Sequence, residues 1–190
     1  LSWCRIQQQA IRVEPLEVDV GKVVDETIRN FQLMLDNKNI VVQMETCQDP
    51  FVCADPDMLK TVFRNLVSNA IKFSYPGSAI SINLHNSEEG LKIKIKDQGT
   101  GMKPEKIRDF LGNKNISSNP GTRQEKGNGL GLALIRDFVT RHGGSIDIHS
   151  TENKGTVFTV SLPYHNCPQK QKSVSANHIH TTEDLALNAT

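Results

Sequence analysis

Residues 65–74, which read Asn65-Leu66-Val67-Ser68-Asn69-Ala70-Ile71-Lys72-Phe73-Ser74, lie in the segment that decides the fold. The segment starts at Asp55-Pro56, a pair typical of a helix N-terminus, because Asp caps the helix and Pro suits its first position. It stops before Pro76-Gly77, a turn signal. The sequence therefore predicts one long helix that ends at about Phe73, with an apolar face. That face carries Leu59, Phe63, Leu66, Ala70 and Phe73.

One edge of this apolar face is polar and carries two carboxamides and an ammonium group: Asn65, Asn69 and Lys72. An amide oxygen is a hard, neutral ligand that suits Mg²⁺, and an ammonium group suits phosphate. The edge is therefore a candidate site for a metal and a phosphate. The alternative is a helix edge that faces solvent, and the helix alone does not decide between the two.

Two glycine-containing motifs follow along the chain. Asp97-Gln98-Gly99-Thr100-Gly101 comes after an apolar strand, where Asp97 could accept a hydrogen bond from an exocyclic amine and the glycines would let the backbone approach a planar base. Gly127-Asn128-Gly129-Leu130-Gly131 opens a helix, where backbone N–H groups favour a phosphate. The alternatives are a tight turn and a Gly-rich hinge. A dinucleotide fold is disfavoured, because the second motif follows a polar loop and not a strand.

The rest of the chain alternates strand-like and helix-like patterns. The predicted strands are 14–20, 40–44, 51–53, 80–84, 91–95, 145–150 and 156–162, and the other predicted helices are 21–37, 104–111 and 130–142. Residues 112–128 are polar, and a loop of this length is often a functional lid. Helices interleaved with mixed strands predict an α/β two-layer sandwich, with one sheet that carries helices on one face.

Composition narrows the classes of partner. The chain has 190 residues and a formal net charge of +1, which gives no electrostatic reason to expect a nucleic acid or an anionic membrane. No apolar run approaches the ~18 residues typical of a membrane span. Its cysteines, Cys4, Cys47, Cys53 and Cys167, form no CxxC pair. We therefore expect free thiols and a reducing compartment.

Taken together and in order, the motifs resemble the N, G1, F, G2 and G3 boxes of sensor histidine kinases. The series runs Asn65-xxx-Asn69 with Lys72 and Phe73, Asp97-x-Gly99-x-Gly101, Phe110, Gly127-x-Gly129-x-Gly131, and Gly155-Thr156. The resemblance covers about Leu16 to Leu162. It implies a Bergerat-type ATP-binding fold, with a mixed sheet of about five strands backed by three helices.

The resemblance also implies a role for each residue of these boxes. Asn69 would bind the Mg²⁺ that bridges the phosphates of ATP, Asn65 would support that metal or its water, and Lys72 would contact phosphate. Asn65 and Lys72 are thus the candidate catalytic residues. Asp97 would hold the adenine amine, with Gly99, Gly101, Thr156 and Phe73 near the base. The phosphates would be wrapped by Gly127, Gly129, Leu130 and Gly131.

The implied function is transfer of the ATP γ-phosphate to a histidine on a dimerisation helix, and onward to an aspartate of a response-regulator receiver domain. Residues 1–11 resemble the end of such a helix but contain no histidine. Residues 12–163 would form the ATP-binding catalytic domain, and residues 164–190 a disordered tail or linker. The parent would be a homodimer with this domain in the cytoplasm. The resemblance leaves open whether the parent is anchored in the inner membrane.

Two other functions stay open at this point. An ATPase of the same fold generally carries a Glu at the position of Asn65 to activate water, and Asn cannot act as a general base. A nucleotide-binding module without catalytic activity would keep the same boxes.

Overall fold

The fold is seen in a computed structural model, which describes residues 13–112, 121–122, 131–165 and 167. The helices are α2 (Val20–Asn30), α3 (Gln32–Lys38), α4 (Pro56–Phe73), α5 (Pro104–Leu111) and α6 (Gly131–Arg141). The strands are β1 (Leu16–Asp19), β2 (Val41–Glu45), β3 (Phe51–Ala54), β4 (Ala79–Ser87), β5 (Gly90–Lys96), β6 (Ser145–Thr151) and β7 (Gly155–Pro163). The helices of the described residues do not combine the length and the hydropathy that a membrane-spanning helix needs.

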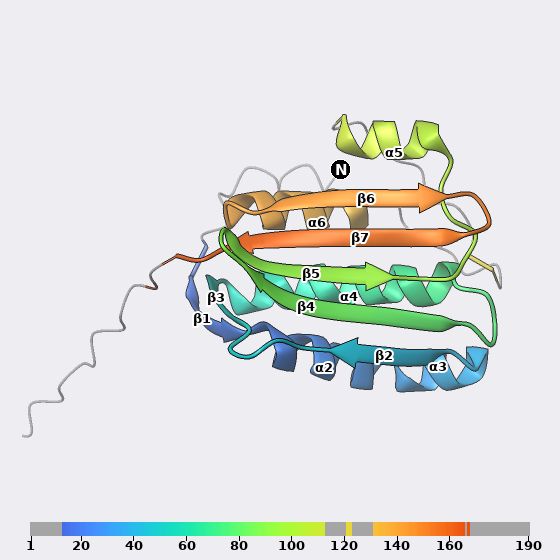
Figure 1. Ribbon diagram of the computed structural model, residues 1–190, viewed down its shortest axis with the longest axis horizontal. Helices are drawn as coiled ribbons and strands as arrows, with labels where there is room; N and C mark the ends of the chain where they lie inside the picture. The colour runs from blue at the N-terminus through green and yellow to red at the C-terminus, as the bar shows by residue number, and fades with distance from the viewer. Residues whose placement is uncertain (1–12, 113–120, 123–130, 166, 168–190) are drawn as a thin grey trace, which may run out of the picture.

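The centre of the fold is a five-stranded sheet of order β2-β4-β5-β7-β6. β2 and β4 run parallel, and the other neighbouring strands run antiparallel. Helices α2, α4 and α6 lie behind one face of this sheet and leave its other face open (Figure 1). The strands β1 and β3 form a separate antiparallel pair. The predicted α/β two-layer sandwich, with about five strands backed by three helices, is therefore confirmed.

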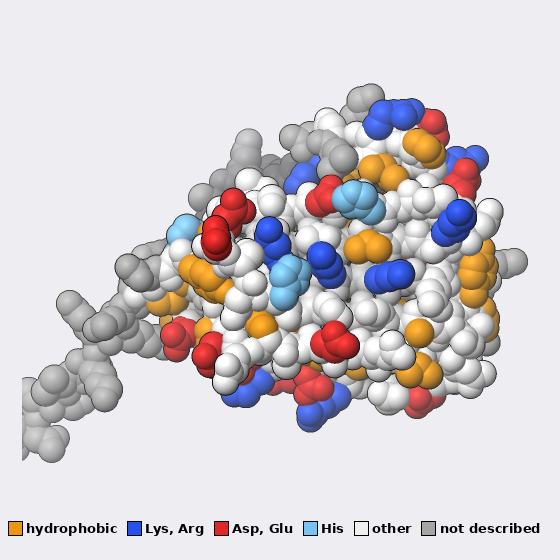
Figure 2. Space-filling view, viewed as in Figure 1, with side chains coloured by type: hydrophobic (Ala, Val, Ile, Leu, Met, Phe, Trp, Pro, Cys, Tyr) orange, Lys and Arg blue, Asp and Glu red, His pale blue; other side chains and the backbone are white. Residues whose placement is uncertain are grey.

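The core follows from the alternation of apolar and polar residues in the sheet. One face of β4 and β5 is buried against the helices and carries Ile80, Ile82, Leu84, Leu91, Ile93 and Ile95. The alternate residues of β5 point to the open face, where Lys94 and Lys96 are exposed and Lys92 is half-buried. Figure 2 shows this open face, with Lys and His side chains spread over the sheet. Period-two patterning thus assigns each face of the sheet correctly.

The first predicted helix, 21–37, is divided in two by the structure. α2 starts at Val20 because Asp19 caps it, its Oδ1 accepting from the backbone N–H of Lys22 at 3.0 Å. The helix then breaks at Phe31, whose φ of −102° and ψ of 7° leave the helical region. The apolar spacing continues across the break, so periodicity alone predicts one helix where there are two.

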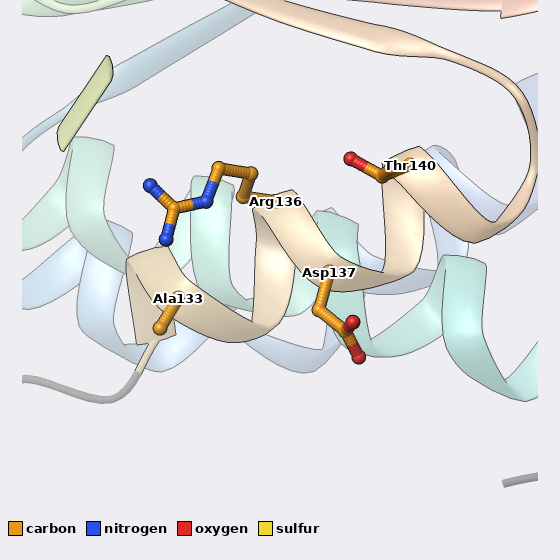
Figure 3. A pocket seen from close by; sticks show the side chains of 4 residues that line it. All are labelled: Ala133, Arg136, Asp137 and Thr140. Atoms are coloured by element: carbon orange, nitrogen blue, oxygen red, sulfur yellow. The ribbon is translucent and has the colours of Figure 1, made fainter. Parts of the chain in front are cut away.

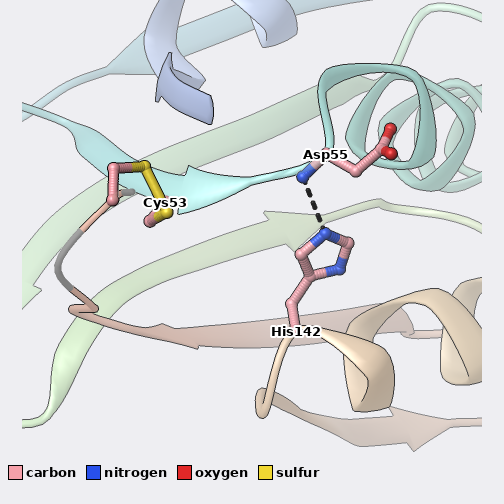
Figure 4. The surroundings of a disulfide bond; sticks show 4 residues. Cys53, Asp55 and His142 are labelled. Atoms are coloured by element: carbon pink, nitrogen blue, oxygen red, sulfur yellow. Dashed lines mark hydrogen bonds between the residues drawn. A yellow bond between two sulfur atoms is a disulfide. The ribbon is translucent and has the colours of Figure 1, made fainter. Parts of the chain in front are cut away.

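The prediction that all four cysteines are free thiols is wrong for two of them. Cys53 on β3 and Cys167 form a disulfide, with their Cα atoms 5.2 Å apart although the two residues are 114 positions apart in the sequence (Figure 4). The bond ties β3 to the segment that follows β7. Cys47 is free, and Cys4 lies outside the described residues. Sequence spacing could not indicate this pair, because only the fold brings the two residues together.

His142, just after α6, joins that helix to the start of α4. Its Nε2 accepts a hydrogen bond of 2.9 Å from the backbone N–H of Asp55 (Figure 4). Since Nε2 accepts, Nδ1 is the donor, and it lies 2.6 Å from the carbonyl oxygen of Phe138. The side chain is buried and hydrogen bonded at both nitrogens, which is a structural role.

Candidate nucleotide-binding site

Helix α4 carries the predicted polar edge. Asp55 caps its N-terminus by accepting from the backbone N–H groups of Asp57 and Met58 at 3.0 and 3.1 Å. The helix lies between α2 and α6 behind the sheet, so it is buried over more than the single predicted face (Figure 1). Lys72 was predicted at a polar edge, yet only 8% of its surface is exposed. Of the predicted apolar face, Leu59, Phe63, Leu66 and Ala70 are buried and Phe73 is half-buried.

Asn65 and Asn69 lie one helical turn apart on α4, so their side chains share an edge. Both are half-buried. The Nδ2 of Asn65 donates to the carbonyl oxygen of Thr61 at 2.8 Å. Its Oδ1 faces Gly131, where an added Cβ would lie only 2.6 Å from that oxygen. The structure thus brings the polar edge of α4 against the first residue of α6.

Asp97 is the buried carboxylate of the site, with 4% of its surface exposed. Its Oδ1 accepts from the backbone N–H of Thr156 at 3.1 Å, and its own N–H donates to the carbonyl oxygen of Thr156 at 2.9 Å. Burial raises the pKa of this carboxyl to about 7, and hydrogen bonds from the backbone N–H groups of Thr156 and Gly99 partly oppose the rise. A buried carboxyl with a perturbed pKa is typical of a functional site.

Two glycines allow the chain to pack tightly around Asp97. Gly155 adopts φ of +95°, and a Cβ there would lie 2.1 Å from the carbonyl oxygen of Asp97. Gly101 adopts φ of +63°, and a Cβ there would lie 2.0 Å from the carbonyl oxygen of Thr151. Only glycine fits at both positions, because each combines a left-handed backbone with a close approach. The predicted G1 motif and the Gly155-Thr156 pair are therefore in direct contact.

The end of α4 meets the same motif. The backbone N–H of Thr100 donates to the carbonyl oxygen of Phe73 at 3.1 Å, and Ser74 forms a β-bridge with Gly99. A Cβ at Gly99 would lie 2.0 Å from the Phe73 carbonyl oxygen. The last turn of α4, which carries Lys72 and Phe73, is thus fixed beside Asp97. Three motifs that are far apart in the sequence converge at one end of the domain.

Lysine side chains bring positive charge to the end of α4. The Nζ of Lys72 lies 4.9 Å from the centroid of the Phe73 ring. On α5, burial lowers the pKa of the Lys106 ammonium, and the positive charges of Lys72 and Lys103 lower it further. An anionic group bound among them would offset this repulsion. No sequence motif marks Lys106, which lies in a helix without a recognisable binding pattern.

Phe110, the predicted F-box residue on α5, is buried and contacts Arg136 on α6. The guanidinium of Arg136 lies 5.6 Å from the centroid of the Phe110 ring, and its Nη1 donates to the Phe110 carbonyl oxygen. Gly127, Gly129 and Leu130 lie outside the described residues, as does most of the predicted lid 112–128. Their predicted contacts with phosphate therefore stay predictions.

A hollow of about 400 Å³ lies on the outer face of α6 and is lined by Ala133, Arg136, Asp137 and Thr140 (Figure 3). The spacing of these residues places them on one helix face, opposite the buried Ile135, Phe138 and Val139. Among the residues that the structure describes, none of the predicted nucleotide-binding residues lines it. The hollow is therefore separate from the convergence of motifs described above.

Comparison with known proteins gives the family. Residues 54–166 match the model of the histidine kinase-, DNA gyrase B- and HSP90-like ATPase family. The chain is 35% identical over 152 residues to the sensor-like histidine kinase SenX3 of Mycobacterium tuberculosis, covering 77% of this chain and 36% of SenX3. It is 28% identical over 163 residues to the sensor protein SrrB of Staphylococcus aureus, covering 86% of this chain and 28% of SrrB. The chain thus spans about a third of the length of these relatives.

Solved structures agree with this assignment. The catalytic domain of the histidine kinase ThkA matches with a TM-score of 0.69 and 27% identity, over 79% of this chain and 97% of that one. The histidine kinase AdeS of Acinetobacter baumannii shares the fold, with a TM-score of 0.67 and 23% identity, over 86% of this chain and 74% of that one. With the ordered boxes and their convergence in space, these matches show that the chain belongs to the histidine kinase-, DNA gyrase B- and HSP90-like ATPase family, as an ATP-binding catalytic domain of the sensor histidine kinase type.

Proposed function

We propose that this domain donates the γ-phosphate of Mg²⁺-ATP to a histidine on a dimerisation helix of its parent kinase, for onward transfer to a receiver-domain aspartate. The observation that carries the proposal is the convergence of the end of α4, the Asp97 motif and the Gly155-Thr156 pair. It offers a buried acceptor for a base at one point and lysine ammonium groups for phosphates nearby. Positioning and charge neutralisation of this kind supply most of the catalysis in phosphoryl transfer.

The base end of the site is Asp97. As a carboxylate it can accept a hydrogen bond from the exocyclic amine of adenine, while its Oδ1 also accepts from the Thr156 N–H. A purine with a carbonyl oxygen at that position would face an acceptor and lose the interaction. Asp97 therefore orients the nucleotide and favours adenine over guanine. Phe73 is half-buried and its carbonyl oxygen lies against Gly99, which supports the proposal that its ring packs near the base.

The phosphate end is α4, with Asn65, Asn69 and Lys72. Its donor set fits Mg²⁺, because a neutral amide oxygen can complete a metal shell made mainly of phosphate oxygens and water. The described residues hold no cluster of three His, Cys, Asp or Glu side chains that would cage a metal alone. Asn69 would hold the ion with Asn65 in support. When bound, Mg²⁺ neutralises phosphate charge, while Lys72 orients the phosphates.

Asn65 favours a kinase over an ATPase. Its Nδ2 donates to Thr61, and its Oδ1 faces Gly131, so a carboxamide stands where hydrolytic relatives would need a carboxylate. A carboxamide cannot take a proton from water at neutral pH. The domain is thereby suited to hold ATP until an external nucleophile arrives. We propose that this nucleophile comes from a homodimeric parent with residues 12–163 as its cytoplasmic catalytic domain.

Labelled ATP tests the proposal directly. The chain is incubated with γ-labelled ATP, with or without a separate protein made of the parent's dimerisation hairpin, and acid-labile label is measured. We expect label on the hairpin and none on this chain, with slow transfer because tethering no longer raises the effective concentration. Acid-labile label on the chain alone, or rapid ATP hydrolysis without a hairpin, would contradict the donor role.

The variant Asn69→Ala provides the matched control for the metal role. We expect it to bind adenosine nearly as well as the wild type, to bind Mg²⁺-ATP much more weakly, and to label the hairpin poorly. Calorimetric titration with both ligands measures the two affinities. Equal losses for adenosine and Mg²⁺-ATP would remove Asn69 from the metal site.

A further inference from the structure

Lys38 is the last residue of α3, and only 3% of its surface is exposed. The following residue, Asn39, adopts φ of 52°, a left-handed cap that ends the helix. The carbonyl oxygen of Lys38 accepts from the backbone N–H of Gly77 at 2.9 Å. The backbone around Lys38 is therefore fixed, and its side chain is held in the interior beside the end of α4.

The ammonium group of Lys38 makes three hydrogen bonds to residues that the structure describes. Its Nζ lies 2.8 Å from the Ile71 carbonyl oxygen, 2.9 Å from the Lys72 carbonyl oxygen and 2.8 Å from Thr122 Oγ1. Carbonyl and hydroxyl oxygens are suitable acceptors for the N–H donors of an ammonium group. A buried charge is costly unless it is paired in this way. The two carbonyls belong to the last turn of α4, where helix carbonyls lack partners within the helix and a positive charge is favoured.

Thr122 is bound to the same turn. Its backbone N–H donates to the Lys72 carbonyl oxygen at 3.1 Å, and its Oγ1 lies 2.8 Å from the Ser74 carbonyl oxygen. The hydroxyl can donate to Ser74 while it accepts from Lys38, so Thr122 is held at three points. Lys38 and Thr122 thus both bind the Lys72 carbonyl oxygen and contact each other, although they are 84 positions apart in the sequence.

We propose that Lys38 and Thr122 are positioning residues of the nucleotide site, which fix the last turn of α4 so that Lys72 meets the phosphates. The inference rests on the proposed function, since it assigns Lys72 to phosphate. It goes further by giving the domain a support for Lys72 that lies in α3 and in the connection between α5 and α6. A cap that only stabilised α4 would affect folding, and would not act on phosphate recognition.

Two substitutions separate these roles. Lys38→Met keeps an unbranched side chain but removes the charge and its donors, and Thr122→Val keeps the shape but removes the hydroxyl. Thr122→Ser keeps the hydroxyl and is the matched control. For each variant of the full chain, calorimetry gives the dissociation constants for Mg²⁺-ATP and for adenosine, and thermal unfolding gives the stability.

We expect Lys38→Met and Thr122→Val to weaken Mg²⁺-ATP binding about tenfold, because binding would then have to order the Lys72 side chain that the turn no longer holds in place. Adenosine binding should change much less, and Thr122→Ser should behave like the wild type. If Lys38→Met does not fold, Thr122→Val decides the matter. Variants that keep the wild-type ratio of the two constants would overturn the positioning role alone. A wild-type chain that binds Mg²⁺-ATP no better than adenosine would overturn the proposed function and this inference together.

Discussion

Asp97 should make both stability and nucleotide binding depend on pH. Burial raises the pKa of its carboxyl from 3.8 to about 7 in the folded protein. Between these values the folded state binds more protons than the unfolded state, so the free energy of unfolding falls as the pH rises. At ~1.4 kcal/mol per pKa unit, this group alone lowers stability by on the order of 4 kcal/mol between pH 4 and pH 8. Asp97→Asn removes that contribution and keeps the acceptor for Thr156.

Base binding should show the opposite dependence on pH. The Oδ1 of Asp97 already accepts from the Thr156 N–H, so a proton on the other carboxyl oxygen would set an O–H donor against the adenine amine, whereas the ionised carboxylate offers a strong acceptor there. With a pKa of about 7, the ionised fraction rises about tenfold between pH 6 and pH 8, so adenosine affinity should rise by about the same factor. Asp97→Asn should bind adenosine weakly and without this dependence, because its Nδ2 is a donor. A buried polar group that is wrongly paired typically costs ~1–3 kcal/mol.

Adenosine is the ligand of choice for this experiment, because the phosphates of ATP titrate in the same range. Calorimetric titrations at pH 6, 7 and 8 give its affinity, and urea unfolding over pH 4 to 8 gives the stability of each protein. The guanine nucleoside serves as the second ligand, against which the wild type should discriminate more strongly than Asp97→Asn. Wild-type affinity that stays flat with pH, or a variant that binds adenosine as tightly as the wild type, would refute the assignment of Asp97 to the base.

Three further predictions concern the frame around the site. Gly155→Ala should destabilise the domain more than Gly77→Ala, since both glycines have positive φ but a Cβ at Gly155 alone would meet the Asp97 carbonyl oxygen; chemical denaturation of both variants tests this, and equal losses would count against crowding. His142→Ala should lower the free energy of unfolding by ~1–3 kcal/mol, because the Asp55 N–H loses its partner, whereas the exposed His149→Ala should change it by less than ~0.5 kcal/mol. Alkylation followed by mass spectrometry should modify Cys53 and Cys167 only after reduction, and their modification without a reductant would show that the disulfide is not formed.

Local sequence signals predicted most of the elements. The Asp55-Pro56 cap and the Pro76-Gly77 turn bound α4 correctly, and alternation in β4 and β5 assigned the faces of the sheet. These signals succeed because caps, turns and periodic burial depend on residues that are neighbours in the chain. The boxes also identified the family, because the order and spacing of these motifs can be read directly from the sequence. The helix 21–37 was predicted as one because its apolar spacing runs through the break at Phe31.

The sequence by itself therefore determined the fold class, the family and the set of candidate residues. Only the tertiary structure decided that Lys72 is buried and that the carboxyl of Asp97 accepts a hydrogen bond from the Thr156 N–H. The same holds for the disulfide between Cys53 and Cys167 and for the hydrogen bonds of Lys38 to the end of α4. Each of these facts joins residues more than thirty positions apart, or depends on how much water reaches a side chain. Burial sets the pKa of a carboxyl and the cost of a charge, and burial is a property of the packed molecule that no local pattern contains.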